Sequence, residues 1–279
     1  MKPLLARLVA GDRLVGDGAM GTMLFHRGLE PGRPPESITL SRPAVLEEIA
    51  QLYLDAGSDI LQTNTFGGSP LKLALHGLEA ETEAINREAV RAVRRVAGDR
   101  AYVCASCGPC GRLLEPYGDV SAAAVYDSFR RQLAALCAAG VDGVIVETMT
   151  DLAEAKLAVR AAKDVSPGIP VLATMTFDAT PRGFFTIMGV SVAAAAAGLL
   201  EAGADAVGSN CGSGIEQMVA IAREFRRHTT APLVIQANAG LPRSVDGRSV
   251  YDETPAFFAE RARGLAEPAV SVVGGCCGT

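Results

Sequence analysis

The chain has 279 residues, of which 49% are hydrophobic and 20% charged, and its formal net charge is −5. This composition is typical of a globular protein, and it offers neither a basic surface for nucleic acid nor a polybasic segment for a membrane. Charge and glycine interrupt the N-terminus too often for a signal peptide, and no uncharged apolar stretch reaches the roughly 18 residues of a membrane span. We therefore expect a cytoplasmic protein that binds neither nucleic acid nor membrane. Its seven cysteines should then be reduced, and such thiols more often bind metal or catalyse than form disulfides.

Eight strand-like segments alternate with seven helix-like segments along the chain. The expected strands are 11–19, 58–66, 101–111, 141–151, 170–178, 204–212, 232–240 and 269–278. The expected helices are 42–57, 81–98, 121–140, 152–165, 191–203, 214–228 and 253–267. The strands are near-continuous apolar runs, as in a parallel sheet covered on both faces. Similar linkers, AGSDI, AGVDG and AGADA, precede the second, fourth and sixth strands.

Repeated βα units of this kind predict an α/β fold with a parallel sheet. Eight units favour a TIM (β/α)8 barrel that occupies residues 1–279 as a single domain. A doubly wound sheet is the alternative, but no G-x-G-x-x-G turn follows the first strand. The eighth helix is expected to be absent or truncated, because only four residues follow Gly275.

Reactive side chains gather where the predicted strands end, which is where TIM barrels carry their chemistry. Cys211 follows the sixth strand, and Cys276 and Cys277 follow the eighth. Three thiolates with one open position are a ligand set that suits a catalytic zinc ion, and the neighbouring glycines allow the turns that aim adjacent side chains at one ion. The alternative is three inert thiols at strand ends.

A second set of cysteines, Cys104, Cys107 and Cys110, resembles part of an iron–sulfur ligand run. We disfavour a cluster because no fourth cysteine follows at short spacing and because Cys104 and Cys107 should point to opposite faces of a strand. These thiols are better interpreted as packing residues.

Two acids, Asp17 and Glu147, also follow predicted strands. Each is either a hydrogen-bonding residue of its loop or a recognition group for a substrate ammonium.

Five segments together resemble the homocysteine S-methyltransferase family. They are DGAMGTML (17–24), TNTFGGS (63–69), ETMTDLAEAKLAV (147–159), GSNCGSG (208–214) and GGCCGT (274–279). The first segment is closer to the homocysteine-binding domain of cobalamin-dependent methionine synthase than to betaine- or S-methylmethionine-dependent enzymes.

The resemblance implies a zinc-dependent methyltransferase that converts homocysteine to methionine. The zinc ligands of the family fall on Cys211, Cys276 and Cys277, and its substrate-binding acids fall on Asp17 and Glu147. The turn at Gly18 and Ala19 would offer backbone N–H groups to the carboxylate of the amino acid. Asn210, beside the first zinc ligand, would orient the site.

The methyl donor is open at this point. One barrel leaves no room for a cobalamin domain, and no D-x-H-x-x-G loop is present. Methylcobalamin would therefore act only through a corrinoid on a separate domain or partner protein. The alternatives are a soluble donor such as S-methylmethionine or betaine, another thiol acceptor, or a zinc- or thiol-binding module without catalysis.

Overall fold

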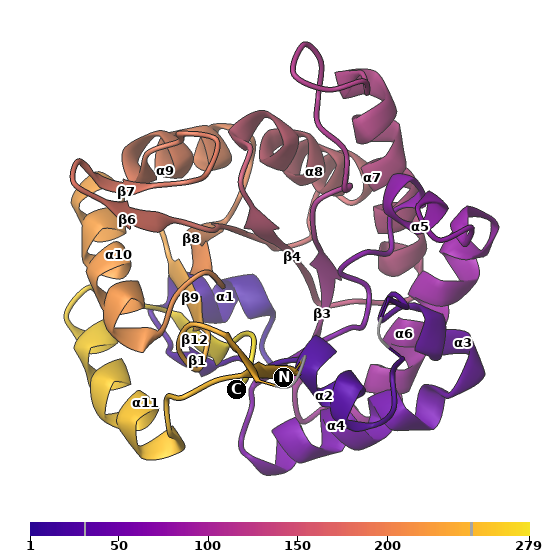
Figure 1. The fold of residues 1–279 in the computed structure, drawn as a ribbon, viewed down its shortest axis with the longest axis horizontal. Coiled ribbons are helices and arrows are strands. Elements are labelled where there is room, and N and C mark those ends of the chain that lie inside the picture. The colour runs from indigo at the N-terminus through magenta and orange to yellow at the C-terminus, as the bar shows by residue number, and fades with distance from the viewer. Residues whose placement is uncertain (31, 246–247) are drawn as a thin grey trace.

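A barrel of eight parallel strands forms the centre of the molecule (Figure 1). The computed structural model describes residues 1–30, 32–245 and 248–279. Neighbouring strands pair in the order β1, β12, β9, β8, β5, β4, β3, β2, and a bridge between Gly16 and Ile60 joins the ends of this series. The strands are β1 (Leu14–Val15), β2 (Ile60–Gln62), β3 (Tyr102–Cys107), β4 (Gly143–Met149), β5 (Val171–Met175), β8 (Ala206–Asn210), β9 (Leu233–Ala237) and β12 (Val272–Gly275). The predicted TIM barrel is confirmed, since a doubly wound sheet would remain open.

The seven predicted helices all lie between successive barrel strands. They are α4 (Pro43–Asp55), α6 (Thr82–Ala97), α7 (Ala122–Ala138), α8 (Leu152–Val165), α9 (Val192–Glu201), α10 (Ile215–His228) and α11 (Pro255–Ala262), which continues as the 3-10 turn η2 (Arg263–Ala266). In the described part of the chain no helix follows β12, as expected. None of the described helices has both the length and the apolar character needed to cross a membrane.

Short elements that the sequence pattern does not predict decorate one end of the barrel. They are α2 (Gly21–His26), α3 (Ser37–Ser41), α5 (Pro70–Ala74), the 3-10 turn η1 (Glu79–Glu81), and the hairpins β6 (Asp178–Thr180) with β7 (Gly183–Phe185) and β10 (Arg243–Val245) with β11 (Arg248–Val250). Each follows the carboxyl end of a barrel strand. Together they build the rim around the end that carries the predicted site.

The opposite end of the barrel is closed by another unpredicted helix, α1 (Leu4–Val9). Its buried Leu4 and Leu8 pack against the apolar side chains of the barrel interior. In Figure 1 this helix lies behind the strands, near the centre of the barrel. The interior at this end is therefore filled, which leaves the carboxyl ends of the strands for chemistry.

The repeated AG-x-D linkers explain how the amino ends of the strands are joined. The aspartates of the three linkers accept hydrogen bonds from backbone N–H groups of neighbouring strands: Asp59 from Val15 at 2.9 Å, Asp142 from Val103 at 2.7 Å, and Asp205 from Val171 at 2.7 Å. Each aspartate also pairs with a basic side chain, namely Arg7, Arg94 and Lys163 respectively. This sequence repeat therefore stabilises the barrel at the amino ends of its strands, away from the carboxyl ends where the predicted site lies.

Candidate metal and substrate site

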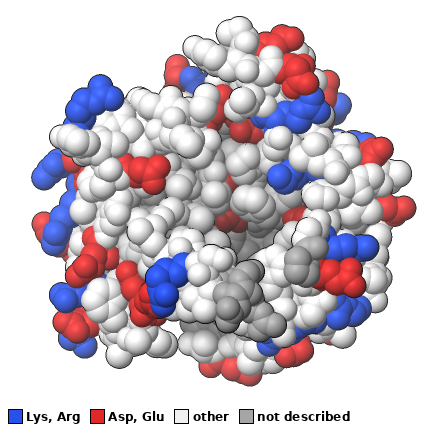
Figure 2. Space-filling view, viewed as in Figure 1, with Lys and Arg blue, Asp and Glu red and all other residues white. Residues whose placement is uncertain are grey.

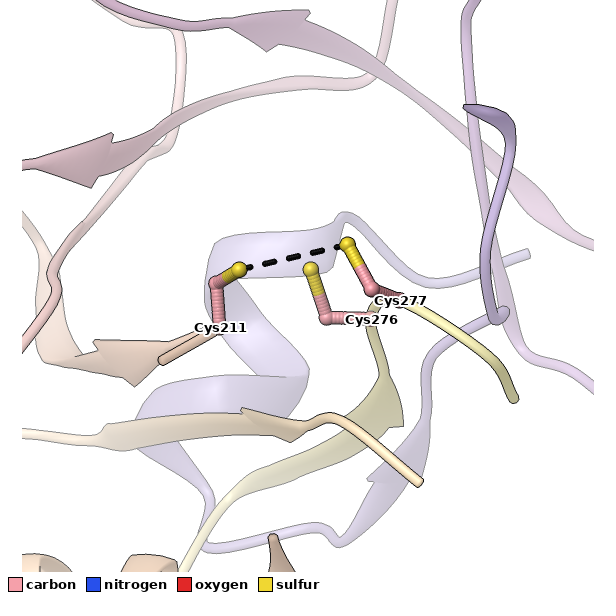
Figure 3. Close-up of side chains that lie close together, drawn as sticks. All are labelled: Cys211, Cys276 and Cys277. Carbon is pink, nitrogen blue, oxygen red and sulfur yellow. Dashed lines mark hydrogen bonds between the residues drawn. The ribbon is translucent and has the colours of Figure 1, made fainter. Parts of the chain in front are cut away.

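Three cysteine sulfurs meet at the carboxyl end of the barrel. Cys211 follows β8, and Cys276 and Cys277 follow β12, which is separated from β8 by β9 alone. The three sulfurs lie within 4.8 Å of one another, and those of Cys211 and Cys277 are 4.0 Å apart (Figure 3). The structure therefore gathers the three predicted ligands, although 65 residues separate Cys211 from Cys276.

Backbone geometry aims the Cys211 side chain. Cys211 has a φ of 60° and Gly212 a φ of 77°, so the chain makes a left-handed turn directly after β8. A non-glycine residue rarely adopts this conformation, and such strain is concentrated at functional sites. The N–H of Cys211 donates to the carbonyl of Gln236 at 3.0 Å, which ties the turn to β9.

The cysteine doublet is tied to the same strand. The N–H of Cys276 donates to the carbonyl of Ala237 at 2.7 Å, and that of Cys277 donates to Oδ1 of Asn238 at 3.0 Å. The N–H of Ala239 in turn donates to the carbonyl of Cys277 at 3.0 Å. The end of β9 thus holds both cysteine loops. This explains how the side chains of Cys276 and Cys277, although adjacent in sequence, both lie near the Cys211 sulfur.

The spacing of the sulfurs fits a tetrahedral zinc ion. Zn–S bonds of about 2.3 Å place tetrahedral sulfur ligands about 3.8 Å apart, close to the 4.0 Å between Cys211 and Cys277. Hydrogen bonds from Cys276 and Cys277 lower the pKa of Cys211, and the same contacts with Cys211 raise the pKa values of the other two. Within the described ranges, this is the sole group of three or more His, Cys, Asp or Glu side chains close enough to share an ion.

Cys104, Cys107 and Cys110 do not form a cluster. Cys104 packs inside the barrel, whereas Cys107 and Cys110 pack in the layer between strands and helices. Burial raises the pKa of each thiol. The iron–sulfur alternative is excluded by this separation, and the expectation that Cys104 and Cys107 occupy opposite faces of β3 is confirmed.

Asp17 lies beside the cysteines, at the end of β1. Its side chain is 4% exposed. Oδ2 accepts from the backbone N–H of Gln62 at 2.6 Å, and Oδ1 accepts from Nε2 of Gln62 at 3.2 Å. Its backbone carbonyl accepts from the N–H of Gly275 at 2.9 Å, which links the acid to the strand that carries the cysteine doublet.

Glu147 faces the same space from β4, where the pairing with β5 shifts register between Val146 and Met149. Thr148, within this irregularity, has a φ of 58°. Such a bulge re-aims side chains and is common beside active sites. The Glu147 carboxylate accepts hydrogen bonds from Oγ of Ser106 and, at 3.3 Å, from Nδ2 of Asn210.

Burial raises the pKa of both carboxyls to about 7. For Asp17 the cause is desolvation, partly offset by the hydrogen bonds from Gln62. For Glu147 the cause is again desolvation, partly offset by Ser106 and reinforced by the charge of Asp17. Two buried acids without a cation are costly to ionise, so a bound cation would stabilise them both.

Asn210 connects the acid and sulfur sides of the site. Its Oδ1 accepts from the Thr148 N–H and from Oγ1 of Thr174, each at 2.7 Å. Its Nδ2 contacts Oγ1 of Thr148 at 2.7 Å and the Cys276 sulfur at 3.8 Å, in addition to Glu147. A fully buried amide with this many partners has one orientation, which suits the orienting role predicted for it.

The turn at Gly18 and Ala19 is fixed by Tyr53 of α4. The Tyr53 hydroxyl donates to the carbonyl of Ala19 at 2.8 Å, and a Cβ on Gly18 would lie 2.9 Å from the Tyr53 ring. The N–H of Ala19 donates to the carbonyl of Thr279 at 3.3 Å, so it is already engaged. Among the described residues the N–H of Gly18 has no hydrogen-bond partner, and it can serve a ligand directly.

A cavity of about 230 Å³ brings these groups together. It is smaller than the roughly 300–1,000 Å³ typical of pockets for drug-sized ligands, so it suits a small metabolite. Its lining includes the three cysteines, Asp17, Gly18, Ala19 and Glu147, with Met20, Gly21, Thr22, Pro35, Gln62, Thr63, Asn64, Phe66, Ser106, Thr148 and Gly275. None of the described residues that line it is a lysine or an arginine, so a ligand with a positive charge would suit the two acids.

Several site residues escape the sequence reasoning, chiefly Gln62, Ser106 and Tyr53. Gln62 and Ser106 are polar residues inside otherwise apolar strands. Alternate residues of a strand face the barrel interior, so a polar residue at one of these positions is a signal that could have identified both Gln62 and Ser106. Nothing in the sequence of α4 distinguishes Tyr53 from an ordinary half-buried helix residue.

Comparison with known proteins identifies the family of the chain. The family model described as homocysteine S-methyltransferase matches residues 14–279. The methionine synthase of Mycobacterium tuberculosis is 34% identical over 285 residues, covering 95% of this chain and 23% of that protein. The methionine synthase of Mycobacterium leprae is 34% identical over 294 residues, covering 99% and 24%. The chain thus spans about a quarter of the length of these curated relatives.

Solved structures confirm the fold. The metallated form of the homocysteine methyltransferase MmuM from Escherichia coli superposes with a TM-score of 0.81 at 24% identity, over 100% of this chain and 96% of that chain. Its oxidized form gives a TM-score of 0.80 at 24% identity over the same shares. Since the family model extends over almost the whole barrel, the chain belongs to the homocysteine S-methyltransferase family.

Proposed function

We propose that this chain binds homocysteine through a zinc ion held by Cys211, Cys276 and Cys277 and transfers a methyl group to its sulfur, giving methionine. One observation carries the proposal: three converging sulfurs and two buried acids line the same small cavity. The ligand that matches has a thiol at one end and an ammonium group at the other. Homocysteine has both.

The two ends of the site divide the work of binding. Asp17 and Glu147 neutralise and orient the ammonium group, because they are acids of a cavity whose described lining residues include no lysine or arginine. The free N–H of Gly18 donates to the substrate carboxylate, and Asn210 holds Glu147 and Cys276 in fixed relation. The fixed distance between acids and sulfurs then selects the length of the substrate, so cysteine, with one methylene fewer, falls short of the metal.

Zinc, when bound, supplies the deprotonation that an ordinary thiol with a pKa of about 8.5 lacks at neutral pH. Cys211, Cys276 and Cys277 would hold the ion, and the substrate thiol would be the further ligand that becomes deprotonated.

A methyl donor carried by a protein fits the face around the cavity. Large apolar side chains on the rim loops are exposed: Leu113 at 54%, Tyr117 at 81%, Ile187 at 80% and Leu241 at 67%. Figure 2 shows that most charged side chains of this face lie near its periphery, around a largely uncharged hollow. Exposed apolar side chains on several loops around a cavity mouth could be covered by a protein that carries the donor, whereas a soluble donor needs no such surface. We therefore assign the donor to a corrinoid on another domain or protein.

Donor assays test this function. The purified, zinc-loaded chain is incubated with homocysteine and either methylcobalamin, S-methylmethionine or betaine, and methionine is quantified. We expect methionine from methylcobalamin, whereas turnover with only a soluble sulfonium or ammonium donor would replace the corrinoid assignment. No methionine with any donor, despite bound zinc, would leave a non-catalytic binding module. The variant Ile187→Asp should lower turnover with a corrinoid protein while leaving homocysteine affinity unchanged.

A further inference from the structure

Three consecutive residues between β11 and α11, Tyr251–Glu253, lie against both cysteine loops. We call this segment the clasp. Its contacts with the Cys211 turn come from Glu253, and its contacts with the cysteine doublet come from Tyr251. No motif or resemblance points to either residue.

Glu253 anchors the turn that carries Cys211. Its Oε2 accepts from the N–H of Ile215 at 3.2 Å, at the start of α10, whose N-cap Gly214 has no side chain to supply this bond. A Cβ on Gly214 would lie 1.9 Å from Oε1 of Glu253, so the carboxylate occupies the space that a side chain would need. A carboxylate here also suits the positive end of a helix dipole. The turn itself is closed by a hydrogen bond from the Ser213 N–H to the Cys211 carbonyl at 2.8 Å.

The backbone of Glu253 extends this anchor to the loop after β9. Its N–H donates to the carbonyl of Ala239 at 3.0 Å. The N–H of Ala239 in turn donates to the carbonyl of Cys277 at 3.0 Å. A single residue of the clasp is therefore connected to the Cys211 turn through its side chain and to the doublet through one intervening residue.

Tyr251 covers the doublet from outside. A Cβ on Gly278 would lie 2.3 Å from Cγ of Tyr251, so the ring packs directly on the backbone that follows Cys277. Gly278 also has a φ of 83°, a left-handed conformation that favours glycine. The phenol hydroxyl lies near the Cys277 sulfur.

We propose that the clasp is a positioning element of the metal site, in which Glu253 and Tyr251 hold the two cysteine loops at the separation that one zinc ion requires. This inference rests on the zinc site of the proposed function. Both loops are tied to β9 on one side, and the clasp ties them on the other. Three thiolates gathered without metal repel one another, so a second tie keeps the loops together and makes the site ready for the ion.

Metal affinity of the full chain tests the clasp without any activity assay. Zinc affinity is measured by chelator competition for the wild type, Glu253→Ala, Glu253→Gln and Tyr251→Phe. Second-sphere partners of a metal site contribute about 10- to 100-fold to affinity, so Glu253→Ala and Tyr251→Phe should each weaken zinc by about that factor. Glu253→Gln keeps an acceptor for the Ile215 N–H and should recover much of the loss.

A control variant at Asp252 and a cobalt absorption spectrum distinguish a role in positioning the cysteines from a role in the stability of the fold. Asp252→Asn removes a charge from the same segment. Among the described residues Asp252 pairs with the exposed Arg243 alone, at 2.5 and 2.8 Å, so the zinc affinity of this variant should match the wild type. Tyr251→Phe keeps the ring on Gly278 and loses only the hydroxyl. In the cobalt-substituted protein it should shift the thiolate-to-cobalt charge-transfer band, which a packing role would leave in place.

The outcomes distinguish the two proposals. Zinc affinities and cobalt spectra of Glu253→Ala and Tyr251→Phe that equal those of a tightly binding wild type would overturn the clasp and leave the metal site intact. A wild type that binds no zinc would overturn the metal site first, and the clasp with it. If Glu253→Ala does not fold, Tyr251→Phe alone decides, through its cobalt spectrum.

Discussion

The chain contains two sets of three cysteines with opposite relations between sequence and space. Cys104, Cys107 and Cys110 lie within seven residues of sequence, yet they are divided between the barrel interior and the helix layer. Cys211, Cys276 and Cys277 are separated by 65 residues at their widest gap, yet their sulfurs lie within 4.8 Å. Closeness in sequence is therefore a poor guide to a ligand set in this fold.

Strand geometry explains the difference. Successive side chains of a strand point to opposite faces, so Cys104 and Cys107 of β3 cannot approach one ion. The carboxyl ends of neighbouring strands meet at one rim, and the turns after β8 and β12 direct their cysteines inward. The first set is fully buried, whereas the second lines an accessible cavity.

The largest expected contrast between the sets is in zinc binding. Cys211→Ser, Cys276→Ala and Cys277→Ala should each weaken zinc by more than about 100-fold, because losing a ligand exceeds the 10- to 100-fold effect of second-sphere changes. Cys107→Ala is the matched control and should keep one zinc per chain, measured by metal analysis after gel filtration. A full equivalent of zinc in any of the first three variants would remove that residue from the ligand set.

For the free energy of unfolding we expect the opposite order, with a larger loss from the buried Cys107 than from the half-buried Cys277. Cys107→Ala creates a small void in the core and breaks the contact of its sulfur with Oε1 of Gln132 at 3.5 Å. This should lower the free energy of unfolding by about 1–2 kcal/mol, measured by urea denaturation of metal-free protein. Under the same conditions Cys277→Ala, at the half-buried rim, should change it by less. An equal loss from both variants would show that the rim thiols also support the apo fold.

Asp17 and Glu147 combine features of the two cysteine sets. They are buried, like Cys104, Cys107 and Cys110, but they line the cavity, like Cys211, Cys276 and Cys277. Glu147→Gln should weaken homocysteine by about 10- to 100-fold, the value of a charge-assisted hydrogen bond, with zinc content unchanged. Glu154→Gln is the control, since Glu154 is also buried but accepts from the N–H of Cys110 outside the cavity, at 2.7 Å. Equal homocysteine affinity in both variants, measured by calorimetry, would show that Glu147 does not hold the ammonium group.

The same two acids predict a dependence of ligand affinity on pH. The pKa values of Asp17 and Glu147 are raised to about 7, chiefly by desolvation, so both carboxyls carry protons below pH 7. An ammonium ligand binds the ionised forms, so each carboxyl that must lose its proton weakens binding by up to about tenfold per pH unit below 7. Norleucine, which has the amino-acid end and no thiol, should bind about 25-fold more weakly at pH 5.5 than at pH 7.5 if one carboxyl must lose its proton, because the ionised fraction of a group with a pKa of about 7 falls about 25-fold between these pH values. A flat profile would contradict the role of the acids.

The strand order and helix order follow from the sequence because buried parallel strands and their capped helices have distinct patterns. The convergence of Cys211, Cys276 and Cys277 also follows, because these residues directly succeed strands. The hydrogen bonds of Asn210 and the contacts of Tyr251 and Glu253 do not follow, since they join segments far apart in the chain. The left-handed backbone conformation of Cys211 could not be predicted from the sequence either. Glycine is the residue expected in that conformation, and Cys211 adopts it because the surrounding structure holds it there.

Zinc X-ray absorption, recorded before and after homocysteine is added, tests the central claim most directly. We predict three protein sulfur neighbours at about 2.3 Å without homocysteine and four with it. Fewer than three sulfurs in the free protein would contradict the ligand set. A sulfur count that stays at three with saturating homocysteine would contradict the proposed activation of its thiol.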